Sequence, residues 1–269
     1  MVLFKYPRDG KKIVSSSSNR IGISSLNHKL INSDFSLLVR FSYSSKASFL
    51  SSAFRSFYLI PRLCIYLKSL QQIQITFDDS VISKLMIRHA KKRVLGIQIH
   101  SLAQAYLETG ENFNIWQKHP SRRNVRKNVR KAQEHGFNLR IVPFPEIAEE
   151  VELLEIKRGG NLPGFWGNFP DNVPQNELIC ASVYSPDNSL MAVCIGSNTN
   201  LTAKIFAAIS TSRSDGARWL AKYGIIEHYF GANVQHLLIS DRIGLKEGHL
   251  EFQKYFGFES KNLNIQESR

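Results

Sequence analysis

Cysteine is scarce in this chain of 269 residues, and the few cysteines follow no paired spacing. Cys64, Cys180 and Cys194 lie far apart, with no C-x-x-C pair among them. Disulfide frameworks and cysteine zinc sites both need such pairs. The eight histidines also lack the H-x-x-x-H and H-E-x-x-H spacings of helical zinc sites. We therefore expect no disulfide, no metal site and a reducing compartment.

Long apolar runs are absent as well. The best candidate, residues 57–67, is interrupted by Pro61 and Arg62, whereas a bilayer span needs roughly 18–20 apolar residues. Residues 1–10 lead into Lys11 and a run of serines instead of an apolar signal segment. These absences predict a protein without a transmembrane segment or a secretory signal, located in the cytoplasm.

Three widespread catalytic motifs are also missing. The chain holds no P-loop and no Rossmann G-x-G-x-x-G. Ser212 and Ser214 do not lie in the G-x-S-x-G context of a nucleophile elbow. Nucleotide hydrolysis and serine-hydrolase chemistry are therefore disfavoured.

Acidic residues are scarce near the N-terminus, which makes the formal charge of +13 uneven. Residues 1–77 hold eleven of the 35 Lys and Arg residues and only two of the 22 acids. A positive field of this kind attracts phosphates on cofactors, nucleic acid or lipid. Residues 15–57 are also serine-rich, and three interpretations stay open for them: a transit-type extension, a degenerate first lobe of a larger fold, or a disordered arm.

What the chain does have, from residue 70 onward, is a regular series of strand and helix patterns. Strands are predicted at 72–77, 93–99, 138–142, 178–184, 190–196, 203–209 and 236–240, and a last short strand after Gly257. Helices are predicted at 101–108, 121–135, 145–157, 215–230 and 249–256. The clearest is 121–135, because Ser121 can cap it and Gly136 can end it. Its apolar residues Val125, Val129 and Ala132 share one face.

This order of elements indicates an α/β (α+β) fold, in which a central, mostly antiparallel mixed sheet is flanked by helices. The length allows one full domain and a partial one. We predict a basic, serine-rich segment at 1–70, a partial lobe or connecting region at 71–115, and the main domain at 116–262.

Three stretches of the main domain carry local patterns that agree in order and spacing. Residues 122–137 form a basic helix sequence that ends in R-K-A-Q-E-H-G-F, residues 214–227 join a small-residue turn to a helix, and residues 248–258 read G-H-L-E-F-Q-K-Y-F-G-F. They resemble the R-K-A-x-x-x-G-[VF] helix, the turn and helix after the central strands, and the G-L-x-x-F-K-x-x-F-G signature of the FemAB-like branch of the GNAT superfamily. The resemblance covers residues 115–260.

The resemblance implies a GNAT-like domain that moves an acyl or aminoacyl group from a thioester or an aminoacyl-tRNA to an amine. Acyl-CoA or aminoacyl-tRNA is then a co-substrate, and no cofactor is bound permanently. The donor's phosphates need N–H groups at a helix N-terminus. In the family this loop reads [QR]-x-x-G-x-[GA], so the donor-binding residues implied here are Arg213, Ser214, Gly216, Ala217 and Arg218.

The catalytic groups follow less directly from the resemblance. Gln253 stands where the family has a Tyr or a Lys, and an amide cannot donate a proton as an acid does. Lys254 lies one residue away. Asp241, after the strand 236–240, is the first candidate for a base and Glu177 is the second. For both carboxylates, an ordinary exposed or capping role is the alternative.

Substrate contacts are predicted on an aromatic loop and on the basic helix. Phe165 and Trp166 lie where the family's acceptor-binding loops lie, although aromatic residues also anchor loops by packing. Arg126, Arg130 and Lys254 complete the predicted substrate-binding set. The helix 121–135 carries two cationic ridges that suit RNA or a phosphorylated substrate, or else form a solvated face. The alternative function is therefore a non-catalytic GNAT scaffold that binds RNA or another polyphosphate through this helix and the basic N-terminal arm.

Overall fold

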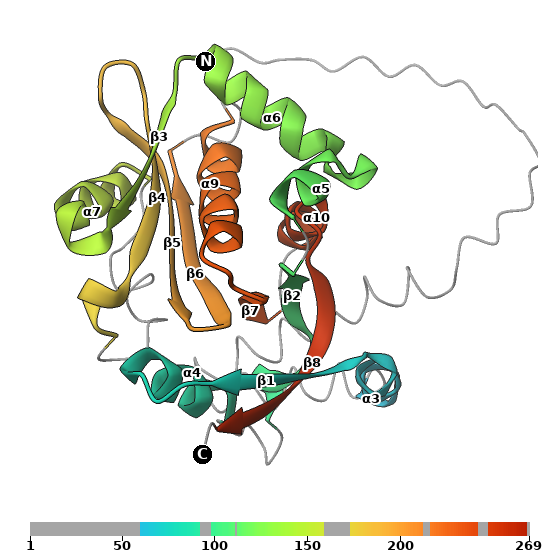
Figure 1. Ribbon diagram of the computed structural model, residues 1–269. Helices are drawn as coiled ribbons and strands as arrows, with labels where there is room; N and C mark the ends of the chain where they lie inside the picture. Colours follow the sequence, from blue (N-terminus) through green and yellow to red (C-terminus); the bar gives the residue numbers. More distant parts are fainter. Residues whose placement is uncertain are drawn as a thin grey trace, which may run out of the picture.

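The fold is built on one mixed sheet of eight strands, in the order β1-β8-β2-β7-β6-β5-β4-β3 (Figure 1). The structure is a computed structural model that describes residues 60–91, 98–110, 112–158, 173–211, 216–241 and 247–267. The strands are β1 (Gln72–Phe77), β2 (Gln104–Glu108), β3 (Asn138–Pro143), β4 (Ile179–Tyr184), β5 (Leu190–Thr199), β6 (Thr202–Ser210), β7 (His236–Asp241) and β8 (Glu259–Glu267).

Most strand pairs in this sheet are antiparallel. Only β1 with β8 and β6 with β7 are parallel among the pairs of the described chain. A parallel pair needs a crossover connection, and the helix α9 (Ala217–Gly231) provides it between β6 and β7. The predicted fold class, a mostly antiparallel mixed sheet flanked by helices, is confirmed.

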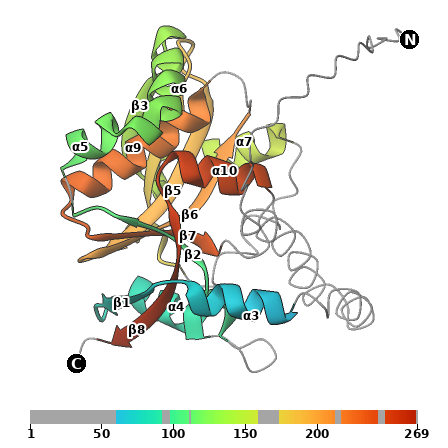
Figure 2. The ribbon, with the colours of Figure 1, turned by 90° about the vertical axis from the view of Figure 1, so that its right-hand side faces the viewer.

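Helices cover both faces of the sheet. The other helices are α3 (Ile60–Ser69), α4 (Val81–Lys91), α5 (Phe113–Lys118), α6 (Arg123–Glu134), α7 (Ala148–Lys157) and α10 (Glu247–Tyr255). Buried side chains of α5, α6 and α9 share one core with one face of the sheet, and partly buried side chains of α10 pack against it. Buried side chains of α4 and α7 share a second core with the other face. Figure 2 shows α5, α6, α9 and α10 together at one end, with α3, α4 and β1 at the other.

The basic helix forms where its sequence predicts it. Val125, Val129 and Ala132 are all buried, as a single apolar stripe requires. After α6 the chain turns at Gly136, whose φ of 73° suits glycine. The backbone N–H of Phe137 then donates to Ala132 O at 3.1 Å, which closes the helix end before β3.

Two local predictions are wrong. The helix predicted at 101–108 is instead the strand β2, which lies between β7 and β8. Four of its five residues are buried. A continuous run of buried residues is typical of a strand that is covered on both faces, whereas a strand with one exposed face alternates buried and exposed residues. Ser121 does not cap α6 either: it lies in a 3-10 turn, where the His119 ring accepts its backbone N–H at 3.3 Å.

The C-terminal strand is longer than the short strand predicted after Gly257. β8 spans nine residues; its first three pair with β2 and the rest pair with β1, for example at Ile75 and Ile265. Of the strand predicted at 93–99, residues 93–97 lie outside the described residues, and Ile99 begins a 3-10 turn. The division of the chain at residues 70 and 115 stays a prediction. No helix in the described ranges has the length and apolarity to cross a membrane.

Candidate functional site

The sheet opens between its two central parallel strands. Three residue pairs alone join β6 to β7: Thr202 with His236, Ala203 with Leu237, and Lys204 with Leu238. Beyond these pairs β6 continues to Ser210 alongside β5, while β7 stays paired with β2 as far as Asp241. The ends of β6 and β7 therefore diverge, and a divergence at the C-terminal ends of parallel strands is a typical place for ligands in α/β sheets.

The helix α9 begins above this divergence with a turn that only glycine fits well. Its N-cap, Gly216, has a φ of 86°. A Cβ atom there would lie 2.6 Å from Asn128 O and 3.2 Å from Ala132 N, both on α6. Ala217 is fully buried. The start of α9 is thus packed against α6, and Arg218 is the first side chain of α9 to reach α10.

Aromatic side chains join α9 to α10. The Trp219 ring lies 4.7 Å from that of Phe252, 5.7 Å from Tyr255 and 5.5 Å from Phe256, measured between ring centroids. The Arg218 guanidinium carbon lies 4.1 Å from the Phe252 ring centroid. Stacked aromatic rings and cation–π contacts of this kind hold two helices in a fixed relation.

A lysine is buried at the same helix interface. Lys222 on α9 is 4% exposed, and its Nζ lies 5.2 Å from the ring centroids of Phe252 and Phe258 and 5.7 Å from that of Phe256. Burial lowers the pKa of its ammonium group to about 8, with Arg218 acting in the same direction and Cys194 opposing it. Buried lysines are rare unless paired, so Lys222 marks this interface as unusual.

Lys222 was not among the residues selected from the sequence. One feature of the sequence could have indicated it: between Trp219 and Glu227, Lys222 is the single charged residue in an otherwise apolar or aromatic stretch of helix. A lysine there reads equally well as a side chain whose stem lies on apolar surface and whose charge reaches water. Only the packing of α10 and β8 against α9 shows that its ammonium group is enclosed.

Gln253 is buried beside this cluster, while Lys254 is not. Gln253 is 4% exposed, and its Oε1 has no hydrogen-bond partner within the part of the chain that is described. Lys254, one position on, is exposed on the outer face of α10, because successive helical residues point about 100° apart. Lys254 therefore does not take the place of Gln253 inside the interface.

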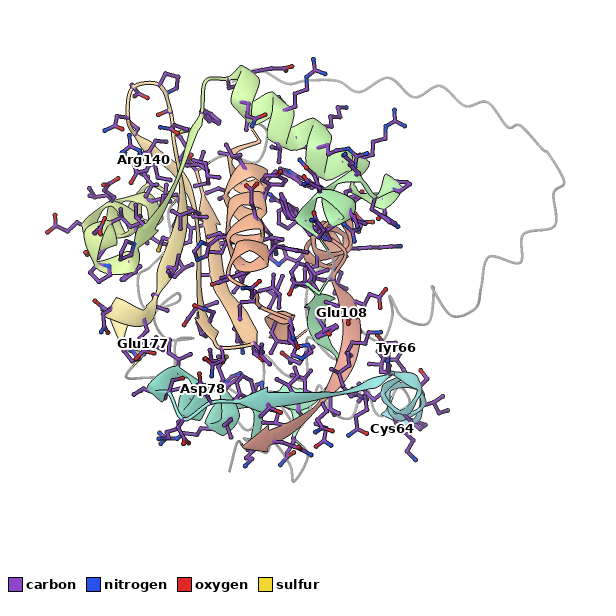
Figure 3. All side chains as sticks on the ribbon, viewed as in Figure 1. Cys64, Tyr66, Asp78, Glu108, Arg140 and Glu177 are labelled. Atoms are coloured by element: carbon purple, nitrogen blue, oxygen red, sulfur yellow. The ribbon has the colours of Figure 1, made fainter. Side chains whose placement is uncertain are left out.

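The two carboxylates predicted as bases do not lie together. Asp241 ends β7 and is the register partner of Gln104 on β2; its side chain lies outside the described residues. Glu177 is half-buried in a 3-10 turn before β4, at the opposite end of that strand from Arg140 (Figure 3). β5 and β6 separate β4 from β7, a spacing of roughly 14 Å. The roles predicted for both residues stay predictions.

The basic helix carries one cationic ridge of Arg122, Arg126 and Arg130 and a second of Arg123, Lys127 and Lys131. Two members of the first ridge contact neighbouring parts of the protein. The Arg126 Nη1 donates to Gln117 O at 2.6 Å and to His119 O at 3.0 Å. Arg122 lies 5.6 Å from the Trp116 ring centroid and donates to Ser121 Oγ. Arg130 is 81% exposed and pairs with Glu134 on its own helix at 2.8 Å. Arg126 thus fastens α6 to the end of α5, whereas the second ridge of α6 faces solvent.

The remaining predicted site residues lie where the structure gives no description. These are Phe165 and Trp166 of the aromatic loop, and Arg213 and Ser214 of the donor loop. Of that donor loop, the structure places Gly216, Ala217 and Arg218 at the start of α9. In the six described ranges, no group of three or more His, Cys, Asp or Glu side chains could hold a metal ion.

Comparison with known proteins finds similarity in structure alone. No protein-family model and no curated protein sequence matches the chain. Solved structures similar to it include a conserved protein of unknown function from Bacteroides thetaiotaomicron (11% identity, TM-score 0.46, covering 60% of this chain and 58% of that one). Another is FemX, with 10% identity and a TM-score of 0.45, covering 59% of this chain and 59% of that one. A third is a GCN5-related N-acetyltransferase from Kribbella flavida, with 12% identity and a TM-score of 0.37, covering 59% of this chain and 54% of that one.

These matches include proteins of the kind that the sequence resemblance predicted. The matched region spans less than two thirds of each of the three solved chains. Every TM-score is below 0.5 and every identity is 12% or less. We therefore take no activity, substrate or residue role from them.

Proposed function

We propose that this protein is an N-acyltransferase, which moves an acyl or aminoacyl group from an activated donor to an amine. The observation that carries the proposal is the divergence of β6 and β7 after Lys204 and Leu238, with cationic side chains of α9 beside it. A divergence of this kind leaves backbone groups of both strands available to an extended ligand. Acyl-CoA or aminoacyl-tRNA is the proposed co-substrate.

The charges at this place suit a phosphate-bearing donor. The first turn of α9 supplies a positive helix end, which favours anions. Arg218 lies in that turn and reaches toward α10. In this proposal the donor's phosphates lie near Arg213 to Arg218, and the acceptor amine approaches from the side of Trp166 and Asp241.

The first test is thermal unfolding of the full chain with acetyl-CoA, with longer acyl-CoAs and with free coenzyme A. A ligand at about 100 times its Kd adds roughly 2.7 kcal/mol, which raises the midpoint by several degrees for a protein of this size. We expect such a rise in the wild type and its loss in Arg218→Gln. Arg88 is exposed on α4, on the other face of the sheet, so Arg88→Gln is the matched control and should retain the rise.

Absence of any rise, with all of these ligands, would contradict a coenzyme A donor. The same measurement with aminoacylated and with uncharged tRNA then separates aminoacyl transfer from plain RNA binding. A rise with charged tRNA alone supports aminoacyl transfer. A rise with both, and none with acyl-CoA, favours the second candidate function.

That second candidate is a non-catalytic protein on the same scaffold that binds RNA. The exposed ridge of α6, with Arg123 and Lys127, favours it. Each phosphate contact with a single strand contributes about 0.7 to the steepness of the fall in log affinity with log salt concentration. Replacing both residues with Gln is therefore expected to reduce that steepness for a single-stranded RNA by about 1.4, measured by fluorescence anisotropy. An unchanged slope would exclude this ridge as the RNA-binding surface.

A further inference from the structure

We propose that Lys222 is a catalytic residue of this site: its ammonium group gives a proton to the leaving group of the acyl donor as the acyl bond breaks. The proposal rests on the acyl transfer proposed above, and it assigns the proton donor that the sequence leaves unassigned. Gln253, at the position where the resemblance expects such a group, has no acidic proton to give.

The first observation is that Lys222 is an enclosed cation with no counter-ion among the described side chains. It is 4% exposed, and it takes part in none of the ion pairs formed by described residues. The groups that act on its charge are Arg218, of the same sign, and the Cys194 thiol. Burying an isolated charge is costly, and such costs concentrate at functional sites, where a ligand supplies the missing partner.

The second observation is the position of the ammonium group. The three rings around Nζ belong to Phe252, Phe256 and Phe258. Phe252 directly precedes Gln253 in α10, and Phe256 directly follows the last residue of α10. The Cys194 thiol, which acts on the Lys222 charge, lies on β5, where Cys194 pairs with Ala208 of β6, beyond Lys204, the last β6 residue that pairs with β7. Lys222 therefore brings its charge from α9 to the part of the core where β6 and β7 diverge.

The neighbouring cations are not suited to the same role. Arg218 lies over Phe252, but a guanidinium group stays protonated at any physiological pH. Lys254 is exposed on the far side of α10. Of the Lys and Arg residues on α9 and α10, Lys222 is the one that is buried and can also release a proton near neutral pH.

The proposed step is balanced without any further reactant. The acceptor amine attacks the carbonyl carbon of the donor and forms the C–N bond. As the C–S bond of a thioester or the C–O bond of an aminoacyl ester breaks, the leaving sulfur or oxygen keeps the bonding electrons and takes a proton from the Lys222 Nζ. The neutral lysine then accepts the proton that the attacking nitrogen releases, and an amide and a free thiol or alcohol leave.

The titration of Lys222 agrees with this role. Burial and the nearby Arg218 lower its pKa to about 8, and Cys194 on β5 acts in the opposite direction. The rings around Nζ, from α10 and the segment that follows it, are the uncharged Phe252, Phe256 and Phe258. An acid with a pKa near the working pH is mostly protonated, yet it still gives up its proton readily. The transfer rate should therefore fall as the pH rises through about 8, because the proton-donating form is lost.

The test uses Lys222→Met in the full chain, with two donors that distinguish a thioester from an ester. One is acetyl-CoA with a mixture of simple primary amines, followed by the release of free thiol. The other is total tRNA charged with labelled amino acids, with the same amines, followed by loss of label from the tRNA. In the arm where the wild type is active, Lys222→Met should be slower by about 100-fold or more.

Two further measurements separate catalysis from structure. Lys222→Met should raise the thermal midpoint, because an apolar side chain of similar size replaces a buried charge that forms no ion pair with any described residue. Adding Gln253→Lys to Lys222→Met returns a cation to the same helix interface, and should restore at least about tenfold of the lost rate. Lys84→Met, on the exposed side of α4, is the matched control and should leave both rate and midpoint unchanged.

The outcomes are distinguishable. A Lys222→Met rate within about threefold of the wild type would overturn the role of Lys222 and leave the proposed acyl transfer intact. A slower variant with a lowered midpoint would show a structural role, and would overturn it as well. A wild type that is inactive in both arms would contradict acyl transfer from these donors, and with it this proposal.

Discussion

Gly216→Val is expected to lower the free energy of unfolding by about 4 kcal/mol. Two costs add at this position. The left-handed backbone, with a φ of 86°, is strained for any residue with a Cβ atom, and more so for a β-branched one. The new Cβ would also lie 2.6 Å from Asn128 O, which is backbone of α6 and cannot rotate away. The effect is measured by urea unfolding followed by circular dichroism.

A second glycine of the same helix gives the matched control. Gly231 ends α9, and a Cβ there meets no atom within 4 Å. Gly231→Ala should therefore raise the free energy of unfolding by about 0.5–1 kcal/mol, from the higher helix propensity of alanine. A Gly216→Val variant as stable as Gly231→Ala would contradict the close packing of α9 on α6. Because α9 begins at the proposed donor site, Gly216→Val should also abolish the acyl-CoA-dependent rise in midpoint.

Tyr229→Ala is expected to lower the free energy of unfolding by about 3–5 kcal/mol. Tyr229 lies in the middle of the core between α9 and the sheet and is fully buried. Its hydroxyl lies against Gly196 of β5, where no room remains for a side chain. Removing the ring leaves a cavity that the close-packed strands below cannot refill. Urea unfolding gives the size of the loss.

Tyr229→Phe should act in the opposite direction. The Tyr229 hydroxyl is buried and has no hydrogen-bond partner among the described residues, and a buried polar group without a partner costs about 1–3 kcal/mol. Removing it should therefore raise the free energy of unfolding by about 1 kcal/mol. A loss of stability in Tyr229→Phe would mean that the hydroxyl is bonded in solution, for example to a trapped water molecule.

The sequence predicted best where local signals and the final structure coincide. The sequence of α6 contains the apolar residues of its buried face, Val125, Val129 and Ala132, and the glycine that ends the helix, Gly136. The turn between β4 and β5 carries Asn188 with a φ of 61° and a bond from its N–H to Ser185 O at 2.9 Å. Such signals act between residues a few positions apart, so the sequence contains them in full.

The sequence misled where a segment takes its structure from distant neighbours. β2 is five residues long, and nothing within it distinguishes a strand from a helix. Its pairing with β7 and β8, more than 100 residues later in the chain, makes it a strand. Arg126 likewise reads as a surface cation, yet its side chain binds two carbonyls at the end of α5.

By itself, therefore, the sequence determined the fold class, most of the helices and strands, and the positive charge of the chain, because periodicity, turn residues and composition are local or additive properties. Only the tertiary structure decided the divergence of β6 from β7, the packing of Gly216 against α6 and the enclosure of Lys222 by three phenylalanine rings. Each of these depends on segments that are distant in the chain and meet only when the core packs. The burial of Lys222 and its lowered pKa result from that packed environment, whereas the sequence shows only that the residue is a lysine.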